Sequence, residues 1–208
     1  MTTAPGPHDV RTLDQLEVLL GEVIEASRNK EVGFIHPLYR AWIEASPFAV
    51  LATAGPGGLD ASPRGDPAGL VTVLDETTLV LPERRGNNRA DSLRNILTDP
   101  RVALLFFIPG VGETLRVNGW ASITVDPALL ERFRVTGKQP TCVVVVEVET
   151  VFFQCARAIH RSRLWQPLPD EVLERVPTAG TMLAALTDGI DQEAYDRDLP
   201  ARQRATLY

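Results

Sequence analysis

The stretch VALLFFIPGVGETLRVNGWASITV, residues 102–125, decides the fold class of this chain. Its first part, 102–109, is almost continuously apolar, and Gly110 and Gly112 allow the chain to turn. Residues 115–125 then alternate between apolar and polar side chains, which is the period of a strand with one face in a core. The pattern predicts an antiparallel pair of strands, the first buried on both faces and the second on one.

Similar strand patterns lie on both sides of this pair, and helical patterns lie before, between and after them. The other predicted strands are 48–53, 59–63, 70–75, 78–82 and 141–155. The predicted helices are 12–28, 38–45, 88–98 and 127–134, followed by a helical segment, 167–208, that prolines divide. The chain is therefore expected to be mainly β with α-helical additions. Strands joined in consecutive hairpins favour an antiparallel barrel, because closure removes exposed strand edges.

The length of 208 residues fits a single domain. Residues 1–10 contain two prolines and a glycine, and they predict a flexible tail. Residues 11–208 are expected to form one domain, with N-terminal helices over 12–45 and a C-terminal helical extension over 167–208.

Composition and missing motifs exclude several classes of function. The formal net charge of -6 argues against a nucleic-acid partner, which requires a basic surface. No apolar run reaches membrane-spanning length and no signal peptide is recognisable, so a cytoplasmic protein without a membrane partner is expected. Two cysteines and three histidines lack the spacing of metal ligands, so no metal site is expected. The motifs of P-loop, zinc-hydrolase and serine-hydrolase sites are also missing.

Three stretches concentrate arginine, hydroxyl and amide donors: 62–67 (SPRGDP), 81–95 and 156–165 (ARAIHRSRLW). Their donors are expected to lack acid partners. A phosphate group suits this chemistry, because it accepts charge-assisted hydrogen bonds from arginine and from free N–H groups at a helix N-terminus. Asn88 and Arg89 lie where a helix is predicted to begin.

A structural interpretation of the same residues stays open. Arg94 one turn after Asp91, and Arg84 beside Glu83, fit solvated surface pairs that contribute little. By the same reasoning, Arg116 fits a solvent-facing position on its strand, and the tryptophans fit packing positions.

The order of these pieces resembles the pyridoxamine 5'-phosphate oxidase-like family of FMN-binding split-barrel proteins. The resemblance covers roughly 48–125, from LATAGPGGLDASP through NILTDPRVALLF, and includes CARAIHRSRLW at 155–165. It is strongest with a branch of FMN-dependent enzymes other than the true oxidase. The tryptophan-glycine-glycine stretch of the true oxidase is missing, and FFQCARAIHR (152–161) matches its C-terminal signature only loosely, so pyridoxamine phosphate oxidation is not assigned.

This resemblance implies a six-stranded antiparallel split barrel, flanked by helices at both termini, that works as a homodimer with FMN at the subunit interface. The cofactor-binding residues that it implies are Arg64, Leu81, Pro82, Arg84, Asn87, Asn88, Arg89, Ser92, Arg116, Arg161 and Trp165. Arg64 takes the place of an arginine that ends the second strand. Leu81 and Pro82 place backbone against the flavin ring.

The resemblance implies two roles for the remaining cofactor-binding residues: some bind the phosphate, and others contact the cofactor across the subunit interface. Asn87, Asn88, Arg89 and Ser92 are the phosphate ligands that the resemblance implies. The resemblance also implies that Arg116 and the segment 161–165 reach the cofactor from the partner subunit. One of Arg84, Arg85 and Arg116 is expected to stabilise the anionic reduced flavin.

The predicted function is an FMN-dependent oxidoreductase that acts on an unknown small-molecule substrate or electron donor, with no catalytic residue assigned. Three alternatives stay open. The protein could store FMN without turnover, it could be an F420-dependent reductase on the same barrel, or it could bind haem with His160 as the axial ligand.

Overall fold

The computed structural model describes residues 6–84, 86 and 89–208, which divide into two compact units, 1–31 and 32–208. The first unit contains α1 (Leu13–Leu20) and α2 (Glu25–Asn29). Thr12 and Gln15 form a reciprocal capping box at the start of α1. The prediction of one helix over 12–28 is wrong, because Gly21 ends α1 at a φ of 74°.

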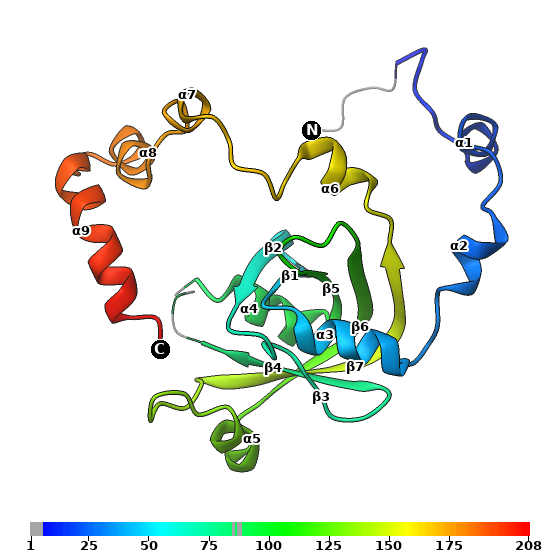
Figure 1. The fold of residues 1–208 in the computed structure, drawn as a ribbon, viewed down its shortest axis with the longest axis horizontal. Coiled ribbons are helices and arrows are strands. Elements are labelled where there is room, and N and C mark those ends of the chain that lie inside the picture. Colours follow the sequence, from blue (N-terminus) through cyan, green and yellow to red (C-terminus); the bar gives the residue numbers. More distant parts are fainter. Residues whose placement is uncertain (1–5, 85, 87–88) are drawn as a thin grey trace. The chain divides into compact units, whose positions relative to one another are not determined.

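The second unit is built on one antiparallel sheet with the strand order β2-β1-β5-β6-β7-β4-β3 (Figure 1). Its strands are β1 (Phe48–Gly55), β2 (Gly58–Gly65), β3 (Thr72–Val73), β4 (Thr78–Glu83), β5 (Arg101–Phe107), β6 (Thr114–Thr124) and β7 (Cys142–Gln154). The prediction of a mainly β chain with helices is confirmed. The count of six strands is wrong, because the hairpin over 72–83 contributes a separate, two-residue β3. Among the described residues no ladder joins β2 to β3, so the sheet is not closed by hydrogen bonds.

The sheet curls, so that strands from its two ends contribute to one core. Leu51 of β1 and Leu81 of β4 are fully buried in the same cluster, although three strands separate β1 from β4. An ion pair also joins the two ends: Arg64 Nε of β2 lies 3.3 Å from Glu83 Oε2 of β4. Such curvature extends the right-handed twist that strands adopt.

Two helices pack against the inner side of the curled sheet: α3 (Pro37–Ala45) and α4 (Asp91–Thr98). Ile43 and Ile96 insert from them into the core. The Asn95 side chain of α4 donates a hydrogen bond to Thr53 Oγ1 of β1, with an N···O distance of 3.0 Å. A Cβ at Gly55 would come within 2.1 Å of that Asn95 side chain, so the close approach of α4 requires glycine there.

The remaining helices are α5 (Pro127–Arg132), α6 (Arg157–Ser162), α7 (Asp170–Leu173), α8 (Ala179–Leu186) and α9 (Gln192–Ala205). The predicted helical segment after residue 167 is confirmed, but α9 continues through Pro200 instead of ending there. The Gly180 N–H donates to Asp196 Oδ1 at 2.7 Å, which ties α8 to α9.

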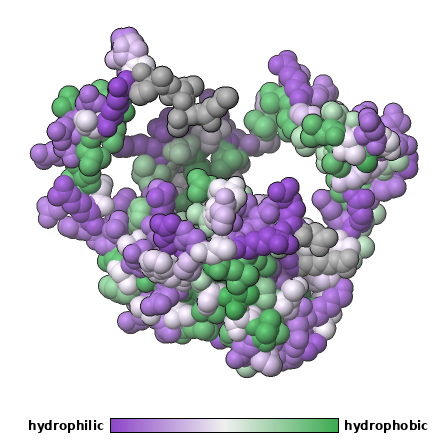
Figure 2. Space-filling view, turned by 180° about the vertical axis from the view of Figure 1, so that it is seen from behind, coloured by the Kyte–Doolittle hydropathy of each residue, from purple (hydrophilic) through white to green (hydrophobic). Residues whose placement is uncertain are grey.

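The outer face of β1 and β5 is apolar but only partly covered. Along β5, Leu104 and Phe106 are buried, whereas the alternate residues Leu105 and Phe107 remain half-buried. The prediction that this strand is buried on both faces is therefore wrong for the single chain. Apolar residues also form patches on the visible surface in Figure 2. We call Phe48, Val50, Leu105 and Phe107, which pair across β1 and β5, the outer apolar face.

Within the described part of the chain, no helix has both the length and the apolar composition that crossing a bilayer requires.

A β-bulge at Asn118 and Gly119 lets β6 pass close to β7. A Cβ at Gly119 would lie 2.1 Å from the Glu147 carbonyl oxygen, so Gly119→Ala forces two backbones apart. We expect this variant to lower the free energy of unfolding by about 3 kcal/mol, measured by urea denaturation. Gly57→Ala is the matched control, because nothing lies within 4 Å of its added Cβ. A Gly119→Ala protein as stable as this control would contradict the geometry.

Candidate functional site

A cleft opens between β2 and the end of β4. Its volume is about 350 Å³, and its lining residues are Ser62, Pro63, Arg64, Gly65, Leu70, Pro82, Glu83, Arg84 and Gly86. The cleft exists because β3 is short: its first residue, Thr72, pairs with Val80, so among the described residues no strand pairs with that edge of β4 beyond Val80. We call this the β2–β4 cleft.

Arg64 is the most unusual residue of the cleft, because its charged side chain is only 8% exposed. Its Nη1 donates to Ser62 Oγ at 2.7 Å and to the Pro63 carbonyl at 3.0 Å. Its Nε lies 3.3 Å from Glu83 Oε2 without the alignment of a hydrogen bond. Its Nη2 has no hydrogen-bond partner among the described residues. Buried donors without acceptors are costly, so these N–H groups are suited to an anionic ligand.

Glu83 faces Arg64 from β4. Burial raises the pKa of the Glu83 carboxyl, and the Arg64 charge only partly offsets this effect. Its Oε2 lacks a hydrogen-bond donor within the described part of the chain. Glu83 therefore neutralises Arg64 only partly, and less so as its carboxyl takes up a proton.

Arg84 follows directly and is held by partners distant in sequence. Its Nε donates to Asp66 Oδ2 at 2.8 Å, and its Nη1 donates to the Phe133 carbonyl at 2.8 Å. The interpretation of Arg84 as a solvated partner of Glu83 is therefore wrong. Glu83 pairs with Arg64, and Arg84 pairs with Asp66.

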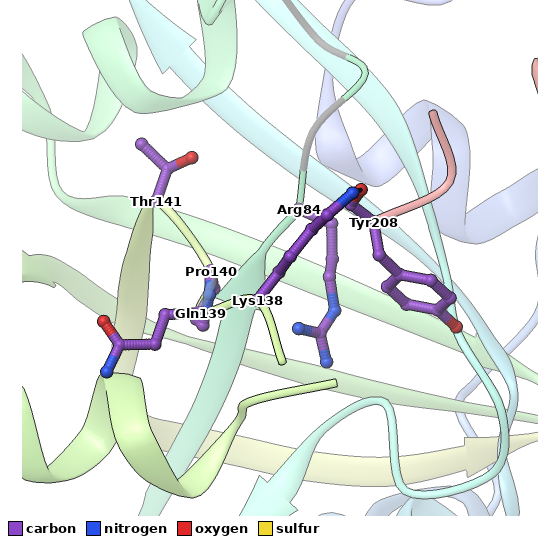
Figure 3. A pocket seen from close by; sticks show the side chains of 6 residues that line it. All are labelled: Arg84, Lys138, Gln139, Pro140, Thr141 and Tyr208. Atoms are coloured by element: carbon purple, nitrogen blue, oxygen red, sulfur yellow. Dashed lines mark hydrogen bonds between the residues drawn. The ribbon is translucent and has the colours of Figure 1, made fainter. Parts of the chain in front are cut away.

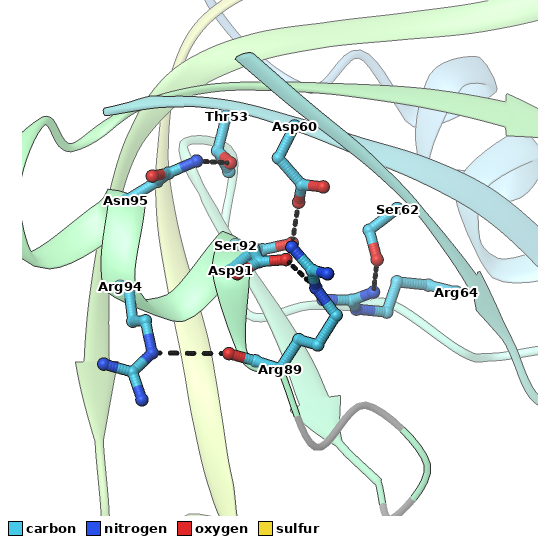
Figure 4. A network of polar contacts seen from close by, with 9 residues as sticks. All are labelled: Thr53, Asp60, Ser62, Arg64, Arg89, Asp91, Ser92, Arg94 and Asn95. Carbon is cyan, nitrogen blue, oxygen red and sulfur yellow. Dashed lines mark hydrogen bonds and ion pairs between the residues drawn. The ribbon is translucent and has the colours of Figure 1, made fainter. Parts of the chain in front are cut away.

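The start of α4 lies near Arg64 in the polar network of Figure 4. Ser92 is fully buried, and its hydroxyl donates to Asp60 Oδ2 at 2.5 Å. Arg89 is 87% exposed, and its Nε donates to Asp91 Oδ2 at 2.7 Å. The residue before α4, Ala90, has a left-handed φ of 54° and provides no side-chain cap, so the first N–H groups of the helix lack the usual cap.

Ser92 is bonded to Asp60 of β2, the strand that also carries Arg64, but neither Ser92 nor Arg89 lines the β2–β4 cleft, so the phosphate site stays a prediction. Asn87, Asn88 and Arg85 lie outside the described residues. The expectation that these donors lack acid partners is wrong, because the fold supplies Glu83, Asp66, Asp60 and Asp91. No local sequence pattern predicts the Arg64–Glu83 pair, because the pair forms only where the curl of the sheet brings β2 close to β4.

Leu81 and Pro82 have different positions. The Leu81 side chain is fully buried in the core, and Leu81 does not line the cleft. Pro82 does line it. The Glu83 carbonyl accepts from the Thr141 N–H, so by strand alternation the backbone of Leu81 also faces β7 and the carbonyl of Pro82 faces the open edge.

Arg116, Arg161 and Trp165 do not line the β2–β4 cleft. The Arg116 guanidinium carbon lies 5.4 Å from the centre of the Phe152 ring, and the Trp165 indole donates to the Val111 carbonyl at 2.6 Å. Arg161 lines a second cavity, of about 480 Å³, next to the outer apolar face. One chain therefore divides the predicted cofactor residues between two places.

The strands that build the β2–β4 cleft lie inside a stretch with a known counterpart. A sequence model of the pyridoxamine 5'-phosphate oxidase family matches residues 35–155, which is more than half of the chain. The chain belongs to this family. The matched stretch runs from the residues before α3 to the end of β7, and it includes Arg64, Glu83 and Ser92.

Solved structures with a similar fold are distant in sequence, and no curated protein matches. HupZ of Group A Streptococcus is 20% identical, with 58% of this chain and 94% of that chain covered and a TM-score of 0.48. General Stress Protein 26 of Bacillus anthracis is 17% identical, with coverages of 54% and 88% and a TM-score of 0.42. A pyridoxamine 5'-phosphate oxidase-related, FMN-binding protein of Nostoc punctiforme is 14% identical, with coverages of 57% and 78% and a TM-score of 0.40. The family assignment depends on the sequence model alone.

The raised pKa of Glu83 predicts how stability depends on pH. The folded state holds the Glu83 proton more tightly than the unfolded state does. The stabilisation of the folded state by this bound proton is therefore fully present below the ordinary pKa of 4.5, and it is lost as pH rises through the pKa of Glu83 in the folded state. We therefore compare the unfolding free energies of the wild type and Glu83→Gln. Their difference, wild type minus variant, should fall as pH rises from the ordinary pKa to the folded pKa of Glu83, by about 1.4 kcal/mol for each unit that separates the two pKa values. Urea denaturation at a series of pH values measures it. A difference that rises with pH would show that the ion pair with Arg64 outweighs burial.

Proposed function

We propose that this protein is a flavoprotein that binds FMN in the β2–β4 cleft and acts as an oxidoreductase. The observation that carries the proposal is the buried Arg64, whose Nη2 has no acceptor among the described residues, within a chain of the pyridoxamine 5'-phosphate oxidase family. A phosphate oxygen is the acceptor that this guanidinium lacks, because arginine binds phosphate through paired, charge-assisted hydrogen bonds.

The phosphate is assigned to Arg64, Arg89 and Ser92, together with Asn87 and Asn88. The Arg89–Asp91 pair is exposed and so contributes little, which lets Arg89 turn to a phosphate at small cost. The uncapped N–H groups at the start of α4 add donors, and a helix N-terminus favours negative charge. Arg64 Nη2 has no protein acceptor in the described structure, and because it is buried, a phosphate would reach it only if neighbouring side chains shift.

The ring of the cofactor is assigned to the open edge of β4. Pro82 presents its carbonyl and ring there, and Leu81 supports it from the core. When bound, FMN supplies the capacity to accept and donate a hydride. Arg84 would place positive charge beside the ring and so stabilise negative charge on it. The site holds no residue to which we assign a proton-transfer role.

The outer apolar face supports a homodimer built from two split barrels, each with six principal strands besides the two-residue β3. Leu105 and Phe107 are apolar and half-buried, and Phe48 is 39% exposed. Contiguous apolar surface of this kind is typical of an interface between subunits. We assign Arg116, Arg161 and Trp165 to the cofactor of the partner subunit, because no single chain brings them to its own cleft.

The binding proposal predicts a yellow protein after incubation with FMN and desalting. Removing one charged hydrogen bond to phosphate costs about 1.5–3 kcal/mol, so Arg64→Met and Arg89→Met should each weaken FMN binding by roughly 10- to 100-fold. Quenching of flavin fluorescence measures the affinity. Arg101→Met is the control, because Arg101 pairs with Asp99 at an exposed position that does not line the cleft.

Wild-type protein that stays colourless would overturn this proposal. Because Arg64 is buried, each variant also needs an unfolding curve, and Ser92→Ala provides a test at a neutral residue. If FMN binds but NAD(P)H neither reduces it nor supports turnover with oxygen, the protein stores FMN instead of using it. Displacement of FMN by F420 would favour the deazaflavin as the cofactor.

The dimer proposal predicts that a charge on the outer apolar face separates the subunits. Leu105→Asp should give a particle of about 22.8 kDa by light scattering, whereas the wild type should have twice that mass. Leu97→Asp is the control, since Leu97 is 77% exposed on α4, away from this face. A wild-type monomer that binds FMN would exclude a cofactor shared between subunits.

A further inference from the structure

The segment after α9 returns to the sheet at a single residue, Tyr208. Its hydroxyl donates to Asp66 Oδ1 at 2.8 Å, and its main-chain carbonyl accepts from Lys138 Nζ at 2.6 Å. Leu207 beside it is 60% exposed. The side chain and carbonyl of Tyr208, and not a wider apolar surface, therefore hold this segment in place.

Asp66 connects Tyr208 to Arg84, because the two oxygens of its carboxylate serve different donors. Oδ1 accepts from the Tyr208 hydroxyl, while Oδ2 accepts from Arg84 Nε at 2.8 Å. The Arg84 guanidinium carbon also lies 5.4 Å from the centre of the Tyr208 ring, within the range of a cation–π contact. Burial and the hydrogen bond to Asp66 both raise the pKa of the Tyr208 phenol, with the hydrogen bond the larger cause, so the phenol stays a donor at neutral pH.

Arg84 lines both the β2–β4 cleft and a second cavity of about 460 Å³, which Figure 3 shows. The lining residues of that cavity are Arg84, Lys138, Gln139, Pro140, Thr141 and Tyr208. Tyr208 itself does not line the cleft. Tyr208 is connected to the cleft through Arg84. The Arg84 Nε donates to Asp66 and its Nη1 donates to the Phe133 carbonyl. No acceptor for its Nη2 is found in the described part of the chain.

We propose that Tyr208 is a positioning residue for the ligand of the β2–β4 cleft: it holds the Arg84 guanidinium so that its Nη2 meets an anionic ligand. This inference rests on the proposed function, in which that ligand is FMN. An arginine side chain loses considerable freedom when it binds, so a residue that restrains Arg84 beforehand increases affinity without touching the ligand. Tyr208 restrains it twice, through its ring and through the carboxylate that both residues share.

The first test compares FMN dissociation constants, measured by quenching of flavin fluorescence. Loss of one cation–π contact and one hydrogen bond predicts about five- to tenfold weaker binding for Tyr208→Ala. Tyr208→Phe keeps the ring over Arg84 and should fall between Tyr208→Ala and the wild type. Tyr195→Ala is the matched control: Tyr195 also has an arginine over its ring, Arg202 at 4.6 Å, but it lines neither cavity.

The second test asks whether Tyr208 acts through Arg84. In an Arg84→Met background, Tyr208→Ala should cause no further loss of FMN affinity, because the residue that it positions is gone. Two fully additive losses would mean that Tyr208 only stabilises the fold, and the proposal would be wrong. Equal affinities of Tyr208→Ala and Tyr195→Ala would also refute it.

A third measurement separates this inference from the proposed function. In the absence of any ligand, Tyr208→Ala should lower Tm by about 2–4 °C, and the decrease should be clearly smaller in the Arg84→Met background, where only the hydrogen bond to Asp66 is left to lose. Wild-type protein that fails to bind FMN overturns the proposed function, while this coupling in the ligand-free protein still reports the contact between Tyr208 and Arg84. Absence of coupling in the ligand-free protein overturns the positioning role whatever the ligand.

Discussion

The ion pair between Arg64 and Glu83 joins two strands that are not neighbours in the sheet, and the site depends on it. Arg64 belongs to β2 and Glu83 to β4, so the pair forms only when the sheet curls until its ends approach. Both side chains are more than nine-tenths buried, where an ion pair gains from weak screening but costs desolvation. The incomplete hydrogen bonding of both partners leaves that cost only partly offset. A ligand that supplies the missing acceptor would stabilise the pair and the curl together.

The electrostatics of the cleft are balanced rather than strongly positive. Each arginine has a carboxylate partner, but the partners differ in how firmly they hold it. The Arg89–Asp91 pair is exposed and therefore weak. Arg84 is fixed by Asp66 and by the Phe133 carbonyl. Arg64 is buried, and its Nη2 has no hydrogen-bond acceptor in the described structure. The small phosphate ligand that we propose fits this arrangement better than a nucleic-acid backbone does, because each arginine already has a carboxylate partner and no broad positive surface remains.

The two faces of β1 and β5 serve different purposes. Leu51, Leu104 and Phe106 point inward to the core that the curl encloses, and Asn95 of α4 locks the helix to β1. The alternate residues point outward and stay half-buried, with an arginine-bearing cavity beside them. A strand that is apolar on both faces therefore carries two interfaces, one within the chain and one that we assign to a second copy. This division explains why the predicted cofactor residues occupy two separate regions of one chain.

The sequence by itself determined the strands, most of the helices and the family. Alternation over 115–125 and the glycine turn before it are local signals, because strand period and turn geometry depend on residues close in the chain. It also identified Arg64, Arg89 and Ser92 as donors. Only the tertiary structure decided which acids those donors meet, that no ladder joins β2 to β3 among the described residues, and that Tyr208 contacts Arg84. Those features join residues up to 142 positions apart, and the curl of the sheet together with the path of the segment after α9, neither of which a local pattern encodes, brings them together.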